Sequence, residues 1–315
     1  MKFLKLTISF LLIFIFSYGV STAQETTLFA ASADTCDNPA PATDSTLYIV
    51  NPNTAASTLV GPIGFQGVTG LAFLGDGRLV ASAQADVGDV MNAIFIEINP
   101  LTGQGSLIGP IGDDETPGEC GRAPDLTYDP ATDTLFAIGR RCVDFDNNDS
   151  VLMEINQITG LGSIIGNIDD GGAGNGLAIR ADGTLFWATN VQGPDGARLF
   201  TINPATGQAT QVTAFSQEFP NLGAFAFHPV TQVLFASSLN PLAPLSFPNA
   251  SLETVNTTTG LLTLVGQLPD CTDAIVFSQQ TPSNVPTLSE WGLIALAGIL
   301  GIVGFMVMRR RKVAA

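Results

Sequence analysis

Short apolar stretches alternate with turn residues along most of the chain. One stretch, of the type Leu-Phe-Thr-Ile, ends at an asparagine that recurs at Asn51, Asn99, Asn156, Asn203 and Asn256. A second apolar stretch follows each copy after a link such as Asn99-Pro-Leu-Thr-Gly. This link has turn chemistry, because Pro fixes φ, Gly accepts a positive φ and Asn can bond its own backbone. The pattern therefore predicts one β-hairpin in each repeat.

A second predicted hairpin follows the first in each repeat. Its first copy joins Gly70–Phe73 to Arg78–Ser82 through Leu-Gly-Asp-Gly. The corresponding pairs of stretches are 126–128 with 135–138, 177–179 with 185–188, and 225–227 with 234–237. Each repeat thus contains four short strands, which is the content of one β-propeller blade. The repeats show no sustained helical period.

The two ends of the repeat region complement each other. The last repeat stops at Ala274–Phe277 without its second strand, and Thr27–Ser32 is a strand without a repeat. A ring closed by joining the termini explains both features. We therefore predict an all-β domain over residues 26–279, a five-bladed β-propeller closed by its termini. The strand order resembles that of NHL and YVTN-type repeats. This resemblance implies that the Gly-Leu-Ala-Phe strand lies nearest the axis and the Thr-Leu-Val-Gly strand outermost.

The predicted topology sorts the connections between two faces. Tight turns such as Asp76-Gly77 and Asp182-Gly183 fall on one face, and longer, irregular connections fall on the other. We expect binding on the long-loop face, because long loops on a rigid scaffold usually carry function. That face is acidic, with candidates Asp113, Asp114, Glu115, Asp169 and Asp170.

One of these loops has the alternating oxygen donors that calcium prefers. Asp144, Asp146, Asn148 and Asp149 resemble the start of an EF-hand loop, which lacks here its Gly and its distal Glu. A calcium ion is the one cofactor that we consider, and a solvated acidic loop without metal is the alternative. The chain has a net charge of −16, and residues 24–285 contain no Lys. This excludes nucleic acid as a partner, since phosphate binding needs clustered cations.

Catalytic signals are poor, and we expect no enzyme. The only histidine, His228, aligns with Asp129 of another repeat and is therefore predicted to be a turn residue on the tight-turn face. Paired loop carboxylates could serve a polysaccharide-cleaving enzyme. Sugar sites usually offer Trp or Tyr platforms, whereas Trp187 lies within a predicted strand as part of the core. A platform of phenylalanines is the remaining alternative, with the candidates Phe145, Phe215 and Phe247.

Four cysteines, Cys36, Cys120, Cys142 and Cys271, lie in the repeat region. An exported chain meets an oxidising compartment, so disulfides are expected. Four cysteines allow three pairings. Cys120 and Cys142 flank one predicted inner hairpin, and Cys271 and Cys36 hold the same positions in the blade that the termini close. The blade register therefore predicts Cys120–Cys142 and Cys36–Cys271.

Both ends of the chain carry export signals. Residues 1–23 contain Lys2 and Lys5, an apolar run over 6–16 and the sequence Ser21-Thr22-Ala23, which predicts a signal peptide cleaved after Ala23. The run is short for a membrane anchor, the alternative reading. An apolar run over 293–308 predicts one transmembrane helix, and the basic tail 309–315 should stay on the cytoplasmic side.

The segment 280–292 joins the propeller to this run and contains the most specific motif of the chain. Its matching residues are Val285, Pro286, Thr287, Leu288, Trp291 and Gly292. Together with the apolar run and the basic end, they resemble the IPTL-CTERM sorting signal of Gram-negative bacteria, with Val285 in place of the usual Ile. The resemblance implies cleavage near Pro286-Thr287 by an exosortase-type transpeptidase.

These expectations describe an exported protein that is anchored in the inner membrane and then reaches the cell surface or the extracellular matrix. We expect a non-enzymatic propeller that binds an envelope or matrix component or serves as surface structure. The alternatives are a secreted enzyme acting on polysaccharide and a calcium-dependent adhesin. A glycan turnover screen would test the first of these, and calorimetry with calcium the second.

Overall fold

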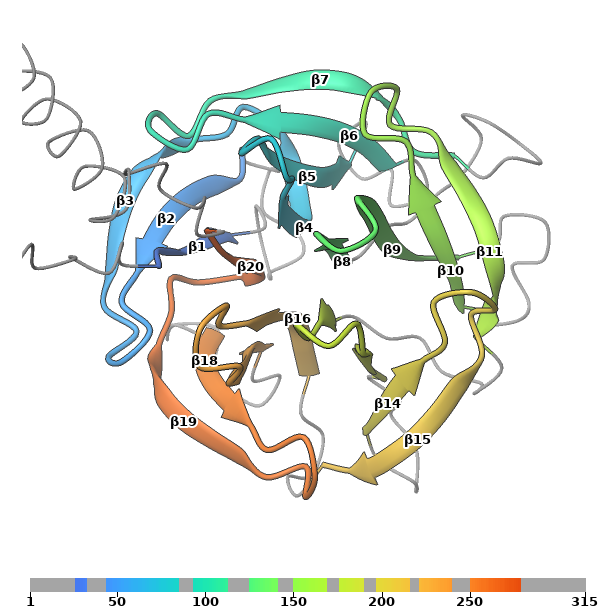
Figure 1. The fold of residues 1–315 in the computed structure, drawn as a ribbon. Helices are drawn as coiled ribbons and strands as arrows, with labels where there is room; N and C mark the ends of the chain where they lie inside the picture. The colour runs from blue at the N-terminus through green and yellow to red at the C-terminus, as the bar shows by residue number, and fades with distance from the viewer. Residues whose placement is uncertain are drawn as a thin grey trace, which may run out of the picture.

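A computed structural model of the chain contains five four-stranded antiparallel sheets arranged as a ring (Figure 1). It describes residues 26–32, 44–84, 93–112, 125–140, 150–168, 176–189, 197–215, 221–239 and 250–278. Within these residues every regular element is a β-strand. The predicted five-bladed propeller is confirmed.

Each blade is named here by its place in the ring, and its strands are given from the axis outward. The first blade comprises β20 (Thr272–Phe277), β1 (Leu28–Ser32), β2 (Thr46–Val50) and β3 (Ser57–Pro62). The second comprises β4 (Gln66–Phe73), β5 (Leu79–Gln84), β6 (Ala93–Ile98) and β7 (Gly105–Pro110). The third comprises β8 (Asp125–Asp129), β9 (Thr134–Arg140), β10 (Ser150–Ile155) and β11 (Gly162–Ile168). The fourth comprises β12 (Leu177–Ile179), β13 (Leu185–Ala188), β14 (Arg198–Ile202) and β15 (Ala209–Ala214), and the fifth β16 (Asn221–Phe227), β17 (Leu234–Leu239), β18 (Ala250–Val255) and β19 (Leu262–Gln267).

The termini close the ring as the sequence predicts. Strand β20 pairs with β1 in antiparallel register, with Leu28 opposite Phe277. The first blade therefore combines the last strand of the described chain with its first three. The predicted innermost strands β4, β8, β12, β16 and β20 surround the axis in Figure 1.

The turn chemistry expected of the Asn-Pro-x-Thr-Gly links is also present. In the second blade the amide of Leu101 donates to Asn99 Oδ1 at 2.9 Å, and the amide of Gly103 donates to the Asn99 carbonyl at 2.8 Å. Gly103 has a φ of 82°, a conformation that glycine adopts without steric cost.

The hydrophobic core consists of wedges between neighbouring blades. Each of the five clusters of buried side chains in the described residues combines residues from two adjacent blades. Phe29 of the first blade and Phe73 of the second, for example, have ring centroids 5.5 Å apart. The alternation of side chains along each strand supplies both faces of a blade, so every blade is buried on two sides.

The outermost strands β3, β7, β11, β15 and β19 contain no charged residue. Unprotected edges invite pairing with other chains, and proteins often blunt them with charges or bulges. Here each outer strand has a register shift against its partner, which leaves one residue of the outer strand unpaired. The shift recurs at the same place in all five blades, so the bulge is the feature that interrupts the edge.

Candidate functional site

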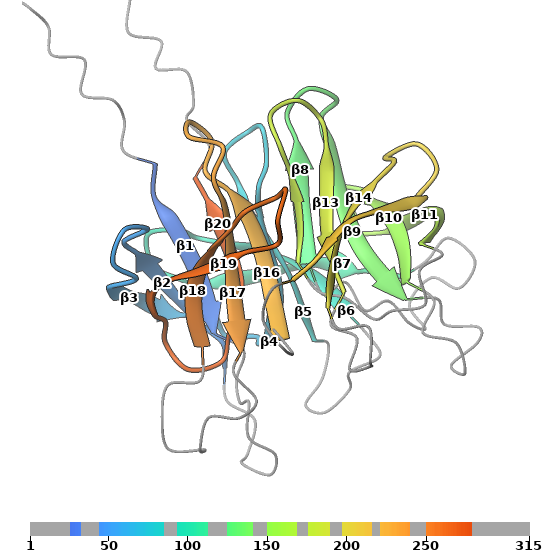
Figure 2. The ribbon, with the colours of Figure 1, turned by 90° about the horizontal axis from the view of Figure 1, so that it is seen from below.

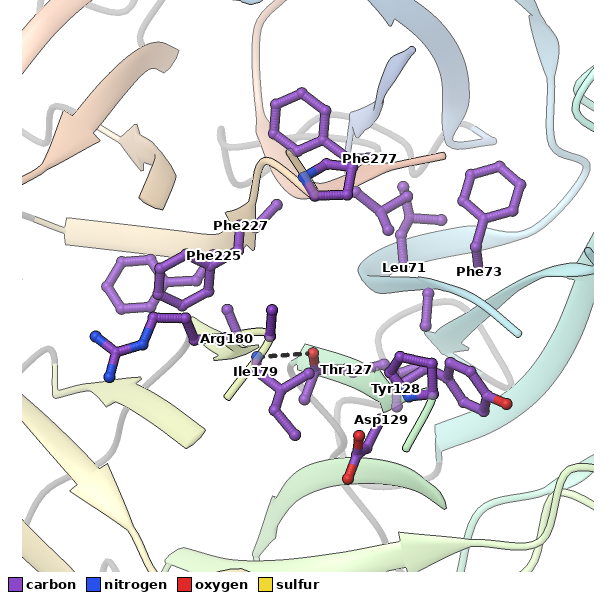
Figure 3. Close-up of a pocket in the computed structure, with 18 of the residues that line it drawn as sticks. Leu71, Phe73, Thr127, Tyr128, Asp129, Ile179, Arg180, Phe225, Phe227 and Phe277 are labelled. Carbon is purple, nitrogen blue, oxygen red and sulfur yellow. Dashed lines mark hydrogen bonds between the residues drawn. The ribbon is translucent and has the colours of Figure 1, made fainter. Parts of the chain in front are cut away.

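A cavity lined by described residues lies on the propeller axis and opens toward the tight-turn face (Figure 3). It has a volume of about 590 Å³ and is lined by the carboxyl-terminal ends of the five innermost strands. We call it the axial pocket. Each of these strands has a neighbour on one side alone, so its other backbone edge faces the axis.

The wall of the axial pocket repeats one position from all five blades. These residues lie at or next to the ends of the innermost strands, and each is opposite a leucine of the adjacent strand: Phe73, Tyr128, Ile179, Phe227 and Phe277. The aromatic rings are supported from behind by the neighbouring blade. Phe227 lies edge-on to Phe186 at 5.5 Å, and Phe277 lies edge-on to Phe235 at 5.3 Å. The wall is therefore apolar and held in place by packing.

The polar residues at the rim are engaged within their own turns. Arg180 forms an ion pair with Asp182 at 2.6 Å and lies over the ring of Phe186 at 5.2 Å. The hydrogen bond that the Arg180 guanidinium donates also lowers the pKa of the Asp182 carboxyl. Asp129 accepts bonds from the amide of Ala131 and from a neighbouring threonine hydroxyl. These groups stabilise turns, and Figure 3 shows the guanidinium of Arg180 directed away from the pocket centre.

The hydroxyl of Tyr128 also points away from the pocket and donates to Asp133 Oδ1 at 2.7 Å (Figure 3). Burial, followed by this hydrogen bond, raises the pKa of Tyr128 to about 12. The phenol is thus neutral at physiological pH, and its ring is what it contributes to the pocket.

Deeper along the axis, a fully buried carboxylate joins three blades. Asp125 accepts hydrogen bonds from the amides of Leu126 at 2.8 Å, Leu177 at 2.7 Å and Phe225 at 3.2 Å. Burial raises the pKa of Asp125 well above its usual range, although the three amides act in the opposite direction, and the charge of Asp273 adds to the rise. Asp125 therefore satisfies amides on the inward edges of β8, β12 and β16.

Sequence reasoning missed Asp125. The other blades place Gly70, Gly176, Ala224 and Ala274 at the equivalent position, as the strand register shows. An acidic residue in a column of Gly and Ala is a detectable signal. Its meaning depends on the ring, because the amides that it bonds come from other blades.

His228 is a turn residue on the tight-turn face, as predicted. Its Nδ1 accepts bonds from the amides of Val230 and Thr231, each at 3.2 Å, in the manner of Asp129. Since Nδ1 is an acceptor, the proton of the neutral ring lies on Nε2, which contacts Thr26 Oγ1 at 3.0 Å. Both ring nitrogens thus serve structural contacts.

Two other predicted residues are found in the core. Trp187 is fully buried in β13, as expected. Phe215, which was a candidate sugar platform, is 8% exposed and packs between the fourth and fifth blades. Its position at the end of an outer strand directs it inward, so it is not available as a platform.

The remaining candidates lie largely outside the described residues. This holds for Asp144, Asp146, Asn148 and Asp149, for Asp113, Asp114, Glu115, Asp169 and Asp170, for Phe145 and Phe247, for Cys36, Cys120 and Cys142, and for the sorting motif 285–292. Cys271 is described and is disulfide-bonded. Its partner lies outside the described residues, so the pairing with Cys36 stays a prediction. Among the residues that the structure describes, no group of three or more His, Cys, Asp and Glu could hold a metal ion.

The sequence predicts a signal peptide over residues 1–23 and a transmembrane helix over residues 293–308. Neither falls within the described residues. The described part of the chain contains no helix long and apolar enough to span a membrane.

Comparison with known proteins identifies the carboxyl-terminal segment. Residues 285–311 match the model of the IPTL-CTERM motif. The chain is therefore a five-bladed β-propeller that carries an IPTL-CTERM sorting signal, and this signal implies an exported, cell-surface protein processed by an exosortase-type enzyme. A search of curated proteins found no match.

Several solved structures align with this chain at low similarity. The PQQ-bound aldose sugar dehydrogenase from Streptomyces coelicolor is 18% identical, with a TM-score of 0.40 over 62% of this chain and 61% of that one. This chain thus spans about three fifths of the dehydrogenase. A putative 6-phosphogluconolactonase from Bacteroides uniformis is 11% identical, with a TM-score of 0.41 over 81% of this chain and 100% of that one. A protein from Lactobacillus plantarum is 14% identical, with a TM-score of 0.40 over 82% and 69% of the two chains. We draw nothing about function from likenesses this distant.

Proposed function

We propose that this protein is a surface-displayed binding module of a Gram-negative bacterium, whose propeller binds an envelope or matrix component without transforming it. The protein passes through an inner-membrane intermediate held by residues 293–308. An exosortase-type transpeptidase then cleaves near Pro286-Thr287 and releases the propeller from that helix. The motif at 285–311 supports the processing step.

The observation that carries the binding role is the construction of the axial pocket. Its lining is mainly apolar and comes from the innermost strands of all five blades, with Leu71, Leu126, Ile179, Ala226 and Val276 among the lining residues. Such a surface binds by burying apolar area, and residues that are fixed by packing lose little freedom when a ligand enters. We therefore place the ligand in the axial pocket. The sequence alone favoured the opposite, long-loop face, because loop length carries no information about where an axial cavity opens.

The same construction favours binding over catalysis. General acid–base chemistry needs a group that can exchange a proton within reach of the substrate. Arg180 and Asp129 at the rim are held in turns, and the hydroxyl of Tyr128 is directed away and bonded to Asp133. His228 uses both ring nitrogens for structural contacts. We expect the pocket to recognise an apolar or aromatic group.

Fluorescence titration with anilinonaphthalene sulfonate tests the binding role on the purified propeller. Thr127 lines the axial pocket, and Thr127→Phe should fill it and weaken dye binding at least tenfold. Thr210→Phe is the matched control, since Thr210 is exposed on the outer strand β15. Equal dye binding by the wild type and Thr127→Phe would place the dye elsewhere and contradict the proposal.

A panel of nitrophenyl glycosides and esters tests the absence of turnover. We expect no nitrophenol release above buffer from the wild type. Release that disappears in Thr127→Phe and persists in Thr210→Phe would show an enzyme with its site in the axial pocket, and would replace the proposed function.

A further inference from the structure

The two ends of the described chain leave the propeller side by side. Leu28 and Phe277 are opposite each other in the pair β1–β20. Beyond them, the amide of Ser278 donates to the Thr27 carbonyl at 2.7 Å, and the amide of Thr27 donates to Ser278 Oγ at 2.9 Å. Figure 2 shows the start of β1 and the end of β20 on the same side as the tight turns.

This exit is fixed to the rim of the axial pocket. Phe277 lines the pocket and lies 4.9 Å from the ring of His228, measured between ring centroids. His228 in turn contacts Thr26. His228 of the fifth blade thus contacts both chain segments that leave the first blade: Thr26, before β1, and Phe277, at the end of β20. A tether that continues from Ser278 must begin at the pocket face.

The opposite face is strongly acidic by sequence. Eight connections join strand ends there: 33–43, 85–92, 113–124, 141–149, 169–175, 190–196, 216–220 and 240–249. Together they contain 15 Asp and Glu and two Arg. The turns of the pocket face contain Asp76, Asp129, Asp133 and Asp182 against Arg78 and Arg180. The charge of the propeller is therefore concentrated away from the exit.

We infer that the tethered propeller is oriented, with its axial pocket facing the anchoring surface and its acidic face pointing outward. The inference rests on the proposed role of residues 293–308 as a membrane helix. Fourteen residues, 279–292, separate Ser278 from that run, and a random coil of fourteen residues has a root-mean-square span of about 20 Å. A domain of this size has a diameter of roughly 45 Å from its expected radius of gyration. Turning the acidic face inward would require the tether to pass around the propeller.

Electrostatics acts in the same direction. Bacterial inner membranes contain anionic lipid, and such a surface repels an acidic protein face over about a Debye length. The pocket face, whose acidic and basic residues nearly balance, is repelled less by the anionic surface. While the tether is intact, the axial pocket is therefore accessible to components that lie at the anchoring surface.

Energy transfer in a reconstituted membrane tests this orientation. The full chain, with its carboxyl-terminal tail, is placed in vesicles of phosphatidylethanolamine and phosphatidylglycerol that contain a rhodamine-labelled lipid. A fluorescent amino acid is introduced at Ala205, an exposed turn residue on the pocket face, or at Gln267, an exposed residue at the opposite end of β19. Both sites are on the outer rim of the ring, so they differ mainly in height.

We expect transfer to the lipid to be at least twofold stronger from Ala205 than from Gln267. Equal transfer, or stronger transfer from Gln267, would overturn the orientation. Flotation of the vesicles separates this outcome from failure of the proposed function: a chain that does not float with the lipid is not tethered by residues 293–308, and the orientation falls with that premise.

Discussion

The carboxylate of Asp125 and the main-chain amide of Phe225 are hydrogen-bonded at 3.2 Å, although they are 100 residues apart and lie in the third and fifth blades. The same side chain bonds Leu177 in the blade between. In the ring each innermost strand has an unpaired edge, and Asp125 satisfies three amides of those edges with one carboxylate. Asp125 thus links the third and fifth blades, which are not neighbours and share no cluster of buried side chains.

Asp125→Asn should destabilise the propeller by about 1–3 kcal/mol, the usual cost of leaving buried donors without an acceptor. The asparagine side chain has one acceptor oxygen where the carboxylate has two, and its NH₂ group would face main-chain N–H donors. Chemical denaturation at pH 7 measures the change. Asp44→Asn, at an exposed position before β2, is the control and should change stability by less than about 0.5 kcal/mol. Equal stability of the two variants would show that the axial bonds contribute nothing.

Glu253 should make the propeller less stable at neutral pH. It is 6% exposed, and burial raises its pKa despite a lowering bond from Ser251. Three of the four equivalent positions hold the apolar residues Ile96, Met153 and Phe200, and the fourth holds Tyr48. A carboxyl whose folded pKa is raised favours the folded state below its unfolded pKa, about 4.3 for Glu. This stability is lost as the pH rises through the folded pKa.

Glu253→Met should therefore raise the free energy of unfolding at pH 7 by roughly 1–3 kcal/mol, with little effect at pH 4. Denaturation at both pH values checks the difference. Glu97→Met, at a more exposed position of β6, serves as the control. A gain that is the same at both pH values would show that packing, and not the charge, limits stability. Asp125, whose pKa is also raised, will add to the pH dependence of both variants.

Gly109→Ala should disturb the contact between the second and third blades. A Cβ atom at Gly109 would lie against the carbonyl oxygen of Thr159 in the turn of the next blade. Gly61 and Gly166 make the same approach to the threonines of their neighbouring turns. Overpacking of this kind costs about 1–3 kcal/mol. Leu107→Ala, on the same strand but 60% exposed, should be nearly neutral in thermal denaturation. Equal melting temperatures of the two variants would show that the close approach of Gly109 to Thr159 does not limit stability.

The predicted disulfide Cys36–Cys271 should lock the closing blade. Ser32 pairs with Thr272, so Cys271 directly precedes the paired segment and Cys36 follows it by four residues. Constraining the unfolded chain should contribute about 2–4 kcal/mol. Cys36→Ser should lower stability by this amount, and reduction, which also breaks the predicted Cys120–Cys142 bond, should lower it further. Peptide mapping that finds Cys36 bonded to Cys120 would contradict the pairing.

Much of the fold follows from the sequence because its determinants are local. The Asn-Pro-x-Thr-Gly links fix hairpin turns, and the strand missing after Phe277 is supplied by Leu28–Ser32. The order of strands from the axis outward is the same in every repeat. Closure by the termini then follows from counting strands, since a blade of three would leave an open edge at the axis.

The site could not be predicted in the same way. The axial pocket is formed by residues from all five blades, and its opening depends on how five strand ends converge. Asp125 bonds amides of Leu177 and Phe225 that only the closed ring brings near it. The contact of His228 with Thr26 joins positions 202 residues apart, and the local motif predicted its turn but not this second contact.

The propeller should be exported and then separated from its membrane helix by processing at the sorting motif. Mass spectrometry of the mature protein from the native host measures both ends of the processed chain. We predict an amino terminus at Gln24 and a carboxyl terminus near Pro286, with Trp291→Ala blocking the second cleavage. A mature surface protein that retains the intact Arg309–Lys312 tail would contradict the claim and leave residues 293–308 as a plain anchor.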